Sequence, residues 1–307
     1  MDVITKIAGN LRHVIRGKQE VVDLLLVALF SDSHVLIEDV PGVGKTTLAK
    51  ALARTIHGIF HRIQFTPDLL PTDIVGGMVY SPNTGQFDFR PGPIFCNVLL
   101  ADEINRASPR TQSALLEAMN ERQVTTEGQT HTLANPFVVV ATQNPIEHHG
   151  TYPLPEAQLD RFAIQLAMGY PDKDQEMAIV KEQKDHHPLE DVTPLVETEE
   201  ITALQARVRA TDVEDSIVSY MMDIVRKTRK DPRLQLGASP RAALVLYRTS
   251  QALAMLRGRS CVIPDDVKEL ALPVLAHRVV LDTKARYSGV EKSTIITEAV
   301  EGTPVPV

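Results

Sequence analysis

The sequence predicts a three-layer αβα domain built on a five-stranded parallel sheet, followed by a small all-α domain. Three observations support this prediction. Short apolar runs alternate with helical patterns over residues 1–170, helical patterns alone fill residues 171–307, and a glycine-rich turn at residues 39–46 joins an apolar run to a helix. Such alternation is typical of parallel sheets covered by helices on both faces.

The five predicted strands are brief, apolar and bounded by turn signals, as strands buried on both faces of a sheet should be. They are Val35–Glu38, Arg62–Phe65, Val98–Ala101, Phe137–Ala141 and Ala163–Ala167. Helical spacing of apolar residues predicts the helices Gln19–Phe30, Thr46–His57 and Arg110–Glu121. Alternating side chains around turn residues predict two hairpins, at about residues 78–89 and 124–133.

Beyond Tyr170-Pro171 the pattern changes to helices with few β-branched runs. The predicted helices are Lys173–Lys184, Glu199–Ala210, Glu214–Lys230, Pro240–Arg257 and Pro264–Val280. We expect an irregular connection at Pro188–Pro194. The last stretch, Ser293–Val307, is rich in Thr, Val and Pro, which predicts a short strand or a loose tail.

The bulk composition is that of an ordinary soluble globular protein, with 307 residues, 43% hydrophobic and 23% charged. The net charge of −7 provides no field that would draw the chain to nucleic acid or to an anionic membrane. Cys96 and Cys261 lie far apart in the chain, which favours unpaired thiols in a reducing cytoplasm. The longest apolar runs fall well short of the ~20 residues of a membrane span, so none is expected.

Two histidine pairs could suggest a metal site. His148-His149 and His186-His187 lack helical ligand spacing, and no cysteine or acidic cluster accompanies them. We therefore expect no metal at either pair.

Residues 39–46 read Asp-Val-Pro-Gly-Val-Gly-Lys-Thr, which is similar to a phosphate-binding loop. Its glycines let successive N–H groups point at an anion, and the following helix adds the positive end of its dipole. Lys45 would reach the β- and γ-phosphates of a nucleotide, and the Thr46 hydroxyl would bind Mg²⁺. The usual pattern opens with Gly where this chain has Asp39, so the loop alone predicts only nucleotide binding. The expected contact residues are Pro41, Gly42, Val43, Gly44, Lys45, Thr46 and Thr47.

Two adjacent acids, Asp102 and Glu103, end the apolar run that begins at Asn97. Ligands of an open parallel sheet bind beyond the carboxyl ends of its strands, where these acids would lie. Asp102 could hold Mg²⁺, directly or through water, and Glu103 could polarise an attacking water. A strand that simply ends in solvated acids is the alternative, and a phosphate-binding loop upstream makes it the weaker one.

Two further residues have open interpretations. Asn144 ends another buried strand and could position a water without adding charge, although Asn144-Pro145 also favours an ordinary turn. Ser239-Pro240 is typical of a helix start, which places Arg241 in the first turn of the helix. A cation there opposes the helix dipole unless an anion compensates. That anion could be a nucleotide phosphate or a nearby surface carboxylate.

Taken in order along the chain, these motifs resemble the MoxR family of AAA+ ATPases over nearly the whole length. The blocks that carry the resemblance are His34–Thr46, Arg62–Asp73, Gly92–Phe95, Leu99–Glu121, Ala141–Pro145 and Tyr152–Phe162. Together and in this order they are highly specific. The resemblance also accommodates Asp39, because Glu38-Asp39-Val40-Pro41-Gly42 is similar to a familiar variant of the loop.

The resemblance implies a role for each matched position in the first domain. Lys45 and Thr46 correspond to Walker A, and Asp102 and Glu103 correspond to Walker B. Asn144 corresponds to the sensor 1 residue. ATP and Mg²⁺ are the implied cofactors.

Three other segments gain a role only from the resemblance. Arg161 matches the arginine finger that a subunit supplies to its neighbour's ATP, which would make hydrolysis depend on assembly. An Asp160–Arg161 surface pair is the weaker alternative. Arg241 matches sensor 2. Ile15-Arg16-Gly17 matches an entry segment that contacts adenine, so Ile15 and Gly17 join the nucleotide-binding candidates.

The resemblance thus implies a Mg²⁺-dependent ATPase that forms a homo-oligomeric ring, with a hexamer expected. Residues 78–89 and 124–133 match the family's helix-2 insert and pre-sensor 1 hairpin. The expected work is chaperone-like remodelling of a protein client or metal-cofactor insertion, with a partner that carries a von Willebrand factor A domain. A nucleotide-gated scaffold with little turnover and a nucleic-acid motor remain alternatives. The second hairpin has an acidic and neutral tip, so no nucleic-acid partner is expected.

Overall fold

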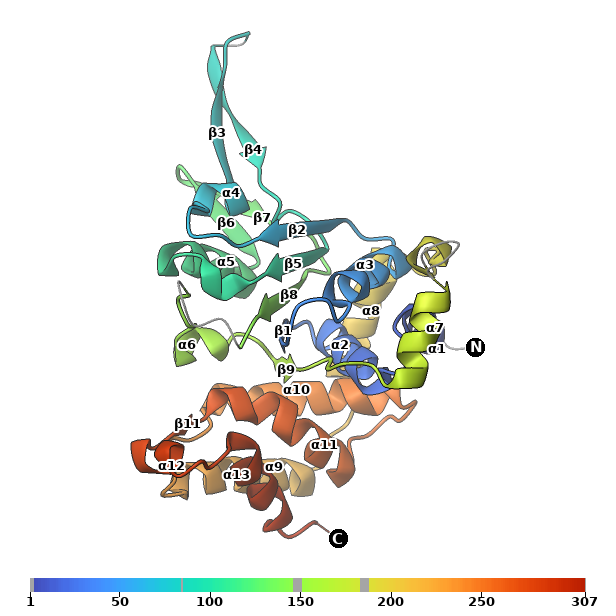
Figure 1. The fold of residues 1–307 in the computed structure, drawn as a ribbon, viewed down its shortest axis with the longest axis vertical. Coiled ribbons are helices and arrows are strands. Elements are labelled where there is room, and N and C mark those ends of the chain that lie inside the picture. The colour runs from blue at the N-terminus through green and yellow to red at the C-terminus, as the bar shows by residue number, and fades with distance from the viewer. Residues whose placement is uncertain (1–2, 84, 146–150, 183–187, 307) are drawn as a thin grey trace. The chain divides into compact units, whose positions relative to one another are not determined.

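The computed structural model describes residues 3–83, 85–145, 151–182 and 188–306 (Figure 1). The predicted absence of metal at His148-His149 and His186-His187 concerns residues outside these ranges. The chain forms two compact units. The first contains Met1–Val22, His34–Leu154 and Ala167–Thr202, and the second contains Asp23–Ser33, Pro155–Leu166 and Ala203–Val307. The division into continuous domains at residue 170 stays a prediction.

The central sheet has five strands in the order β2-β5-β8-β1-β9, which confirms the predicted parallel five-stranded α/β class. The strands are β1 (Val35–Glu38), β2 (Phe60–Gln64), β5 (Val98–Asp102), β8 (Val138–Gln143) and β9 (Ile164–Leu166). The side chains of β1, β5 and β8 are buried almost throughout, because neighbouring elements cover them on both faces. β1, the first strand along the chain, thus lies inside the sheet, next to β8. Ligands of α/β sheets bind at such a position, beyond the carboxyl ends of the strands.

Helices of the first unit pack on this sheet and on each other. They are α1 (Val3–Val14), α3 (Lys45–Thr55), α4 (Pro71–Val75), α5 (Pro109–Glu121), α7 (Lys173–Glu182) and the 3₁₀ turns η1 (Ile104–Arg106) and η2 (Pro188–Asp191). Helix α3 contacts both β2 and β5, and α1 contacts α3. Two helices cross from one unit to the other along the chain, α2 (Gln19–Phe30) and α8 (Thr198–Arg209).

Two antiparallel strand pairs occupy the segments for which hairpins are predicted. The pair β3 (Gly76–Ser81) and β4 (Gln86–Pro91) extends away from the sheet in Figure 1. The pair β6 (Gln123–Thr126) and β7 (Gln129–Thr132) follows α5 directly. The two hairpins touch, since the ring of His131 stacks on Phe89 with 3.8 Å between the ring centroids.

The second unit is mainly helical. Its elements are α6 (Glu156–Leu159), α9 (Asp215–Lys230), α10 (Pro240–Leu256), α11 (Pro264–Leu275), η3 (Ala276–Arg278), α12 (Thr283–Tyr287), α13 (Lys292–Glu301) and the short pair β10 (Leu234–Leu236) and β11 (Val280–Leu281). Helix α10 packs on α9 and α11, and α11 packs on α13. The predicted helical lid after the α/β region is therefore confirmed.

The structure corrects two local predictions and adds a helix near the N-terminus. The stretch Ser293–Val307 is mostly helical, because α13 buries Ile295, Ile296 and Ala299, and this burial outweighs the low helix propensity of its β-branched residues. The helix predicted at Pro264–Val280 ends at Leu275 and continues as the 3₁₀ turn η3. Helix α1 was not predicted, although its buried residues Ile4, Ile7, Ala8 and Leu11 recur at helical spacing.

Among the described residues, no helix is both long and apolar enough to cross a membrane.

Gln112 on α5 anchors the turn that follows β5. Its side chain is fully buried, and Nε2 lies 3.2 Å from the carbonyl oxygens of Ile104 and Ala107 and 2.9 Å from that of Tyr152. These carbonyls belong to the connection between β5 and α5 and to a later loop. Gln112 therefore fixes the chain immediately after Asp102 and Glu103.

We predict that Gln112→Leu lowers the free energy of unfolding by about 1–3 kcal/mol, because buried carbonyls lose their donor. Chemical denaturation monitored by circular dichroism measures this change. Gln86→Leu on the exposed strand β4 is the matched control and should stay within about 0.5 kcal/mol of wild type. Equal stability of the two variants would contradict an anchoring role for Gln112.

Candidate functional site

The loop between β1 and α3 has the geometry of an anion cradle. Gly42 and Gly44 have φ angles of 89° and 96°, in the left-handed region that glycine adopts without strain. Helix α3 begins directly after them at Lys45, so its unpaired N–H groups and its positive dipole end adjoin the loop. The local sequence thus produces a site suited to phosphate.

Lys45 folds back onto this loop. Its Nζ donates to the carbonyl oxygens of Asp39 at 2.7 Å and Val40 at 3.1 Å. Burial lowers the pKa of the Lys45 ammonium, while the carboxylates of Asp39, Asp102 and Glu103 act in the opposite direction. The charged groups of the site are therefore one ammonium and the three carboxylates that act on it.

Asp39, at the position where glycine is usual, ties the loop to another segment. Its Oδ1 accepts from the N–H of Val40 at 2.8 Å, and its Oδ2 accepts from the N–H of Gly169 at 2.6 Å. The side chain is buried, with 8% of the residue exposed. A glycine at this position has no side chain and could accept neither bond. Asp39 therefore stabilises the loop in a way that the usual glycine cannot.

A polar cavity of about 380 Å³ lies in front of the loop. It is lined by the loop and by the carboxyl ends of β2, β5 and β8. The lining residues are Asp39, Pro41, Gly42, Gly44, Lys45, Thr46, Arg62, Gln64, Asp102, Glu103, Thr142 and Asn144. The structure therefore brings the predicted residues Lys45, Thr46, Asp102, Glu103 and Asn144 into one cavity.

Asp102 is held between two donors at the end of β5. The hydroxyl of Thr142 donates to its Oδ1 at 2.6 Å, and Nη2 of Arg62 donates to its Oδ2 at 2.6 Å. Thr142 also accepts from the N–H of Glu103 at 2.9 Å. The carboxylate is thus fixed in direction and faces the same cavity as the Thr46 hydroxyl.

The backbone of Glu103, directly after β5, has a φ of 57°. This value lies in the left-handed region and is uncommon for residues other than glycine. Oε2 of Glu103 accepts from Nε2 of Gln64 at 2.6 Å and from Nη1 of Arg106 at 2.8 Å. Gln64 in turn accepts from Arg62 at 3.0 Å, so one chain of hydrogen bonds joins the two acids. Neither Arg62 nor Gln64 was predicted as a site residue.

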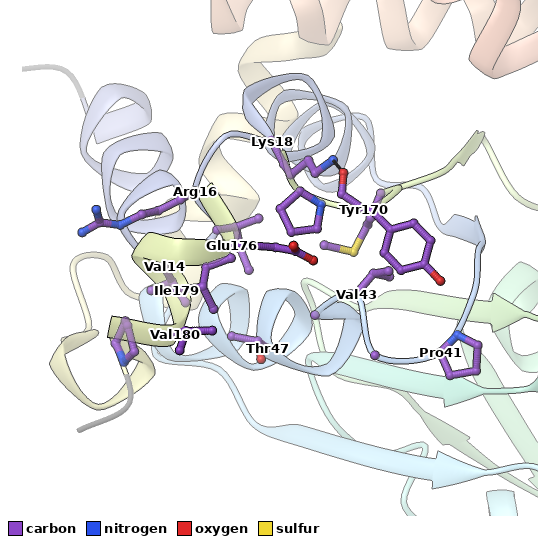
Figure 2. Close-up of a pocket in the computed structure, with 16 residues that line it drawn as sticks. Val14, Arg16, Lys18, Pro41, Val43, Thr47, Tyr170, Glu176, Ile179 and Val180 are labelled. Atoms are coloured by element: carbon purple, nitrogen blue, oxygen red, sulfur yellow. Dashed lines mark hydrogen bonds between the residues drawn. The ribbon is translucent and has the colours of Figure 1, made fainter. Parts of the chain in front are cut away.

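An adjoining cavity of about 600 Å³ shares Pro41, Gly42 and Gly44 with the polar one. Apolar side chains form most of its wall, and Figure 2 shows Val43 and Tyr170 on one side and Ile179 and Val180 on another. Its lining comprises Val14, Ile15, Arg16, Lys18, Pro41, Gly42, Val43, Gly44, Thr47, Met168, Tyr170, Pro171, Glu176, Ile179, Val180 and Pro188. An apolar pocket with a few polar groups suits a heterocyclic base.

The predicted entry segment contributes to this second cavity unevenly. Ile15 lines it, whereas Gly17 packs against Gln175 of α7, where a Cβ would come within 2.1 Å of the glutamine side chain. Lys18, the next residue, donates from Nζ to the carbonyl oxygen of Tyr170 at 2.9 Å (Figure 2). Gly17 is thus a close-packing position beside the cavity.

The wall formed by residues 168–180 was missed by sequence reasoning. These residues follow β9 and include α7, whose amphipathic pattern gave no sign of what its apolar face covers. Arg62 and Gln64 had a usable signal, because residues two apart in a strand point the same way and would share the edge with Asp102.

Arg161 and Arg241 belong to the second unit. Arg161 is half-buried and lies two residues beyond the end of the short helix α6, whereas Arg241 is exposed in the first turn of α10. The N-cap of α10 is the predicted Ser239, whose hydroxyl accepts from the N–H of Ala242 at 3.1 Å.

The described residues contain no cluster of three or more His, Cys, Asp or Glu side chains that could hold a metal by themselves. Cys96 is buried, which raises the pKa of its thiol to about 12, and Cys261 is exposed; both are free. Neither thiol lines the two cavities.

Comparison with known proteins agrees with this geometry. Residues 34–164 match the model of the ATPase family associated with various cellular activities (AAA), and residues 226–299 match that of the AAA lid domain. The chain is 48% identical to the uncharacterized protein YeaC of Bacillus subtilis, over 99% of this chain and 95% of that protein. It is 42% identical to the chaperone MoxR1 of Mycobacterium tuberculosis, over 97% and 81% of the two chains.

A solved structure of a protein assigned as an ATPase, from Cytophaga hutchinsonii, superposes with a TM-score of 0.92. Its sequence is 36% identical, and the match covers 99% of this chain and 95% of that chain. The similarity therefore includes both the α/β region and the helical region.

We predict that Asp39→Ala weakens ATP binding about tenfold, because the loop and the residue 169 segment lose two hydrogen bonds to a charged acceptor. Titration with a fluorescent ATP analogue measures the dissociation constant. Asp39→Asn keeps one acceptor oxygen and should fall between Asp39→Ala and wild type.

Asp88→Ala on the exposed part of β4 is the matched control and should bind as wild type does. Tighter binding by Asp39→Ala would show that charge repulsion between this carboxylate and the phosphates outweighs its role as a tether.

Proposed function

This chain belongs to the MoxR family of AAA+ ATPases and hydrolyses ATP, and from this premise we propose how its residues divide the work. The observation that carries the proposal is the pair of adjoining cavities that share Pro41, Gly42 and Gly44. The triphosphate would occupy the polar cavity and the adenine would occupy the apolar one. The glycine-rich loop lies between them, where the α- and β-phosphates would be cradled.

Mg²⁺ is the expected companion of the triphosphate, and the residues present fit it. The Thr46 hydroxyl and the Asp102 carboxylate are hard oxygen donors in one cavity, and magnesium prefers such ligands. When bound, the ion would offset negative charge on the phosphate oxygens. Arg62 donates to the same carboxylate, with 47% of its side chain exposed, so it is free to turn away when a cation takes that oxygen.

Glu103 is the proposed group that orients and polarises the attacking water. Its position next to Asp102 in the polar cavity would bring it near the γ-phosphate, and Gln64 and Arg106 donate hydrogen bonds to its carboxylate. Asn144, which is buried at the end of β8, would position the same water through an uncharged amide. Lys45 would leave the carbonyls of its own loop for the phosphates, which are the stronger acceptors.

Arg161 is the proposed finger for the ATP of a neighbouring copy in a closed homo-oligomeric ring, with six copies expected. A guanidinium supplied in trans stabilises charge that develops in the transition state, and it makes turnover depend on assembly. Arg241 would act as sensor 2 and couple the nucleotide state to movement of the helical region.

The work done by hydrolysis is proposed to be chaperone-like remodelling of a protein client or insertion of a metal cofactor. A relative with 42% identity carries the name chaperone. A partner with a von Willebrand factor A domain would deliver the client, and the hairpins β3–β4 and β6–β7 would contact it. Two free cysteines are consistent with the cytoplasm as the compartment.

We predict that Glu103→Gln lowers kcat at least about a hundredfold, because the amide cannot act as a general base. ATP should bind with a dissociation constant within about threefold of wild type, since Glu103 is not among the groups proposed to hold the phosphates. Single-turnover hydrolysis and nucleotide titration measure the two quantities.

Glu117→Gln on the exposed face of α5 is the matched control and should hydrolyse ATP normally. Loss of ATP binding by Glu103→Gln would contradict the assigned role. A wild-type rate near zero with tight ATP binding would instead favour a nucleotide-gated scaffold.

We predict that Arg161→Ala and Glu103→Gln, each nearly inactive alone, regain activity when they are mixed. One interface type in a mixed ring combines an intact Glu103 with an intact Arg161, so activity should reach about a quarter of wild type at equal amounts. The steady-state ATPase rate against mixing ratio is the measurement.

Arg226→Ala, at an exposed position of α9, is the matched control and should stay fully active alone. Absence of recovery in the mixture, or full activity of Arg161→Ala, would contradict a finger supplied in trans.

A further inference from the structure

The segment that carries Arg161 is held by a buried arginine of the second unit. The side chain of Arg278, in η3, is only 1% exposed. Its Nε donates to Oδ1 of Asp160 at 2.7 Å, and its Nη2 donates to the carbonyl oxygens of Phe162 at 2.5 Å and of Asp160 at 3.3 Å. Both residues that flank Arg161 in the chain therefore bind the same guanidinium.

Further contacts of this guanidinium make the attachment rigid. Nη1 of Arg278 donates to the carbonyl oxygen of Ala163 at 3.0 Å and also to that of Val274. Nε2 of His277 lies 2.9 Å from the carbonyl oxygen of Phe162, and burial lowers the pKa of this imidazole well below its usual value. Nε2 of this ring also lies 2.7 Å from Nη1 of Arg278, so the imidazole packs against both the guanidinium and the Phe162 carbonyl.

Arg278 keeps its charge in this environment. Burial lowers the pKa of the guanidinium to about 10, and the carboxylate of Asp160 opposes the shift. The side chain therefore remains protonated at neutral pH. A charged planar fork with several donors is suited to binding a carboxylate and several carbonyls at once, which an ammonium group cannot do.

Asp160 also reaches the helix that carries Arg241. Its Oδ2 accepts from the hydroxyl of Ser239 at 3.4 Å, and the same hydroxyl caps α10 by accepting from Ala242. Arg241 is two residues further on, in the first turn of that helix. It is close enough to Arg278 for its positive charge to contribute to the lowered pKa of that guanidinium.

We infer that Arg278 and Asp160 are positioning residues that join the Arg161 segment to the start of α10, so that Arg161 and Arg241 move as one body. We call Arg278, Asp160 and Ser239 the clamp. This inference rests on the proposed roles of Arg161 and Arg241 in ATP hydrolysis. A change at one of the two arginines is then transmitted to the other by the clamp, without a large rearrangement of the helices.

Double-mutant cycles test the clamp in the full-length assembled protein. Asp160→Asn keeps the size of the side chain and removes the charge that Arg278 binds. We expect kcat to fall about tenfold to a hundredfold while KM for ATP stays within about twofold, because a misplaced catalytic group affects the chemical step. In an Arg161→Ala background, the same substitution should change kcat by less than about twofold.

Arg278→Lys keeps the charge but loses the planar fork, and it should reproduce both results of Asp160→Asn. A merely structural role would lower kcat by the same factor in both backgrounds, and this outcome would overturn the inference. Unchanged kcat in Asp160→Asn would overturn it as well.

Ser239→Gly tests the link to Arg241 and decides the question if the other two variants fail to fold. Glycine is an acceptable N-cap, so the variant should fold, but the bond to Asp160 is lost. We expect kcat to fall about threefold, the size of one hydrogen bond, and this loss to be absent in an Arg241→Ala background. Equal losses in both backgrounds would overturn the link.

Asp231→Asn is the matched control, because Asp231 also pairs with an arginine of the second unit, Arg233, at 2.7 Å. Its kcat should equal that of wild type, and thermal unfolding of all variants reports folding. If Arg161→Ala itself is fully active, the proposed finger fails, and the clamp fails with it. If Arg161→Ala is inactive but Asp160→Asn acts independently of it, only the clamp fails.

Discussion

The parallel register of four strands is the constraint on which the site depends. Gln64 of β2 is paired with Asp102 of β5, and Thr142 of β8 is paired with Ile37 of β1, one residue before the strand ends. Because Ala101 is also paired with Ala141, the ends of all four strands lie within one residue of each other. A slip of one residue would turn every side chain of the strand to the other face of the sheet. The buried apolar faces of β1, β5 and β8 prevent that slip.

At this edge the two acids are parts of one hydrogen-bonded chain. Asp102 binds Thr142 and Arg62, Arg62 binds Gln64, and Gln64 binds Glu103. A cation that takes an oxygen of Asp102 competes with Arg62, and movement of Arg62 also affects the partner of Gln64. In the proposed function, metal binding at Asp102 would thereby be linked to the direction of Glu103 through β2, a strand that bears no acid of its own at this edge.

In the second unit, the side chain of Asp160 likewise joins two segments of the chain. One carboxylate binds a buried guanidinium through one oxygen and a helix cap through the other. Such a pair costs desolvation and adds little net stability, so its value lies in the single arrangement that it permits. Here that arrangement fixes the chain on either side of Arg161. The same logic applies to Asp39, whose buried carboxylate joins the phosphate loop to residue 169.

The sequence by itself determined the α/β class, the strands, and the loop residues, acids and asparagine of the polar cavity, because each depends on local information. Glycines at 42 and 44 permit the loop, apolar runs form buried strands, and Asp102, Glu103 and Asn144 lie where those strands end. Only the tertiary structure decided that Arg62 and Gln64 bind the acids, that α7 walls the apolar cavity, and that Arg278 holds the Asp160 segment. The hydrogen bonds among these contacts join residues up to 118 positions apart, and their geometry follows from packing that no local pattern encodes. The same reason made α13 helical where composition suggested a strand or a tail, since burial of Ile295 and Ile296 outweighs intrinsic propensity.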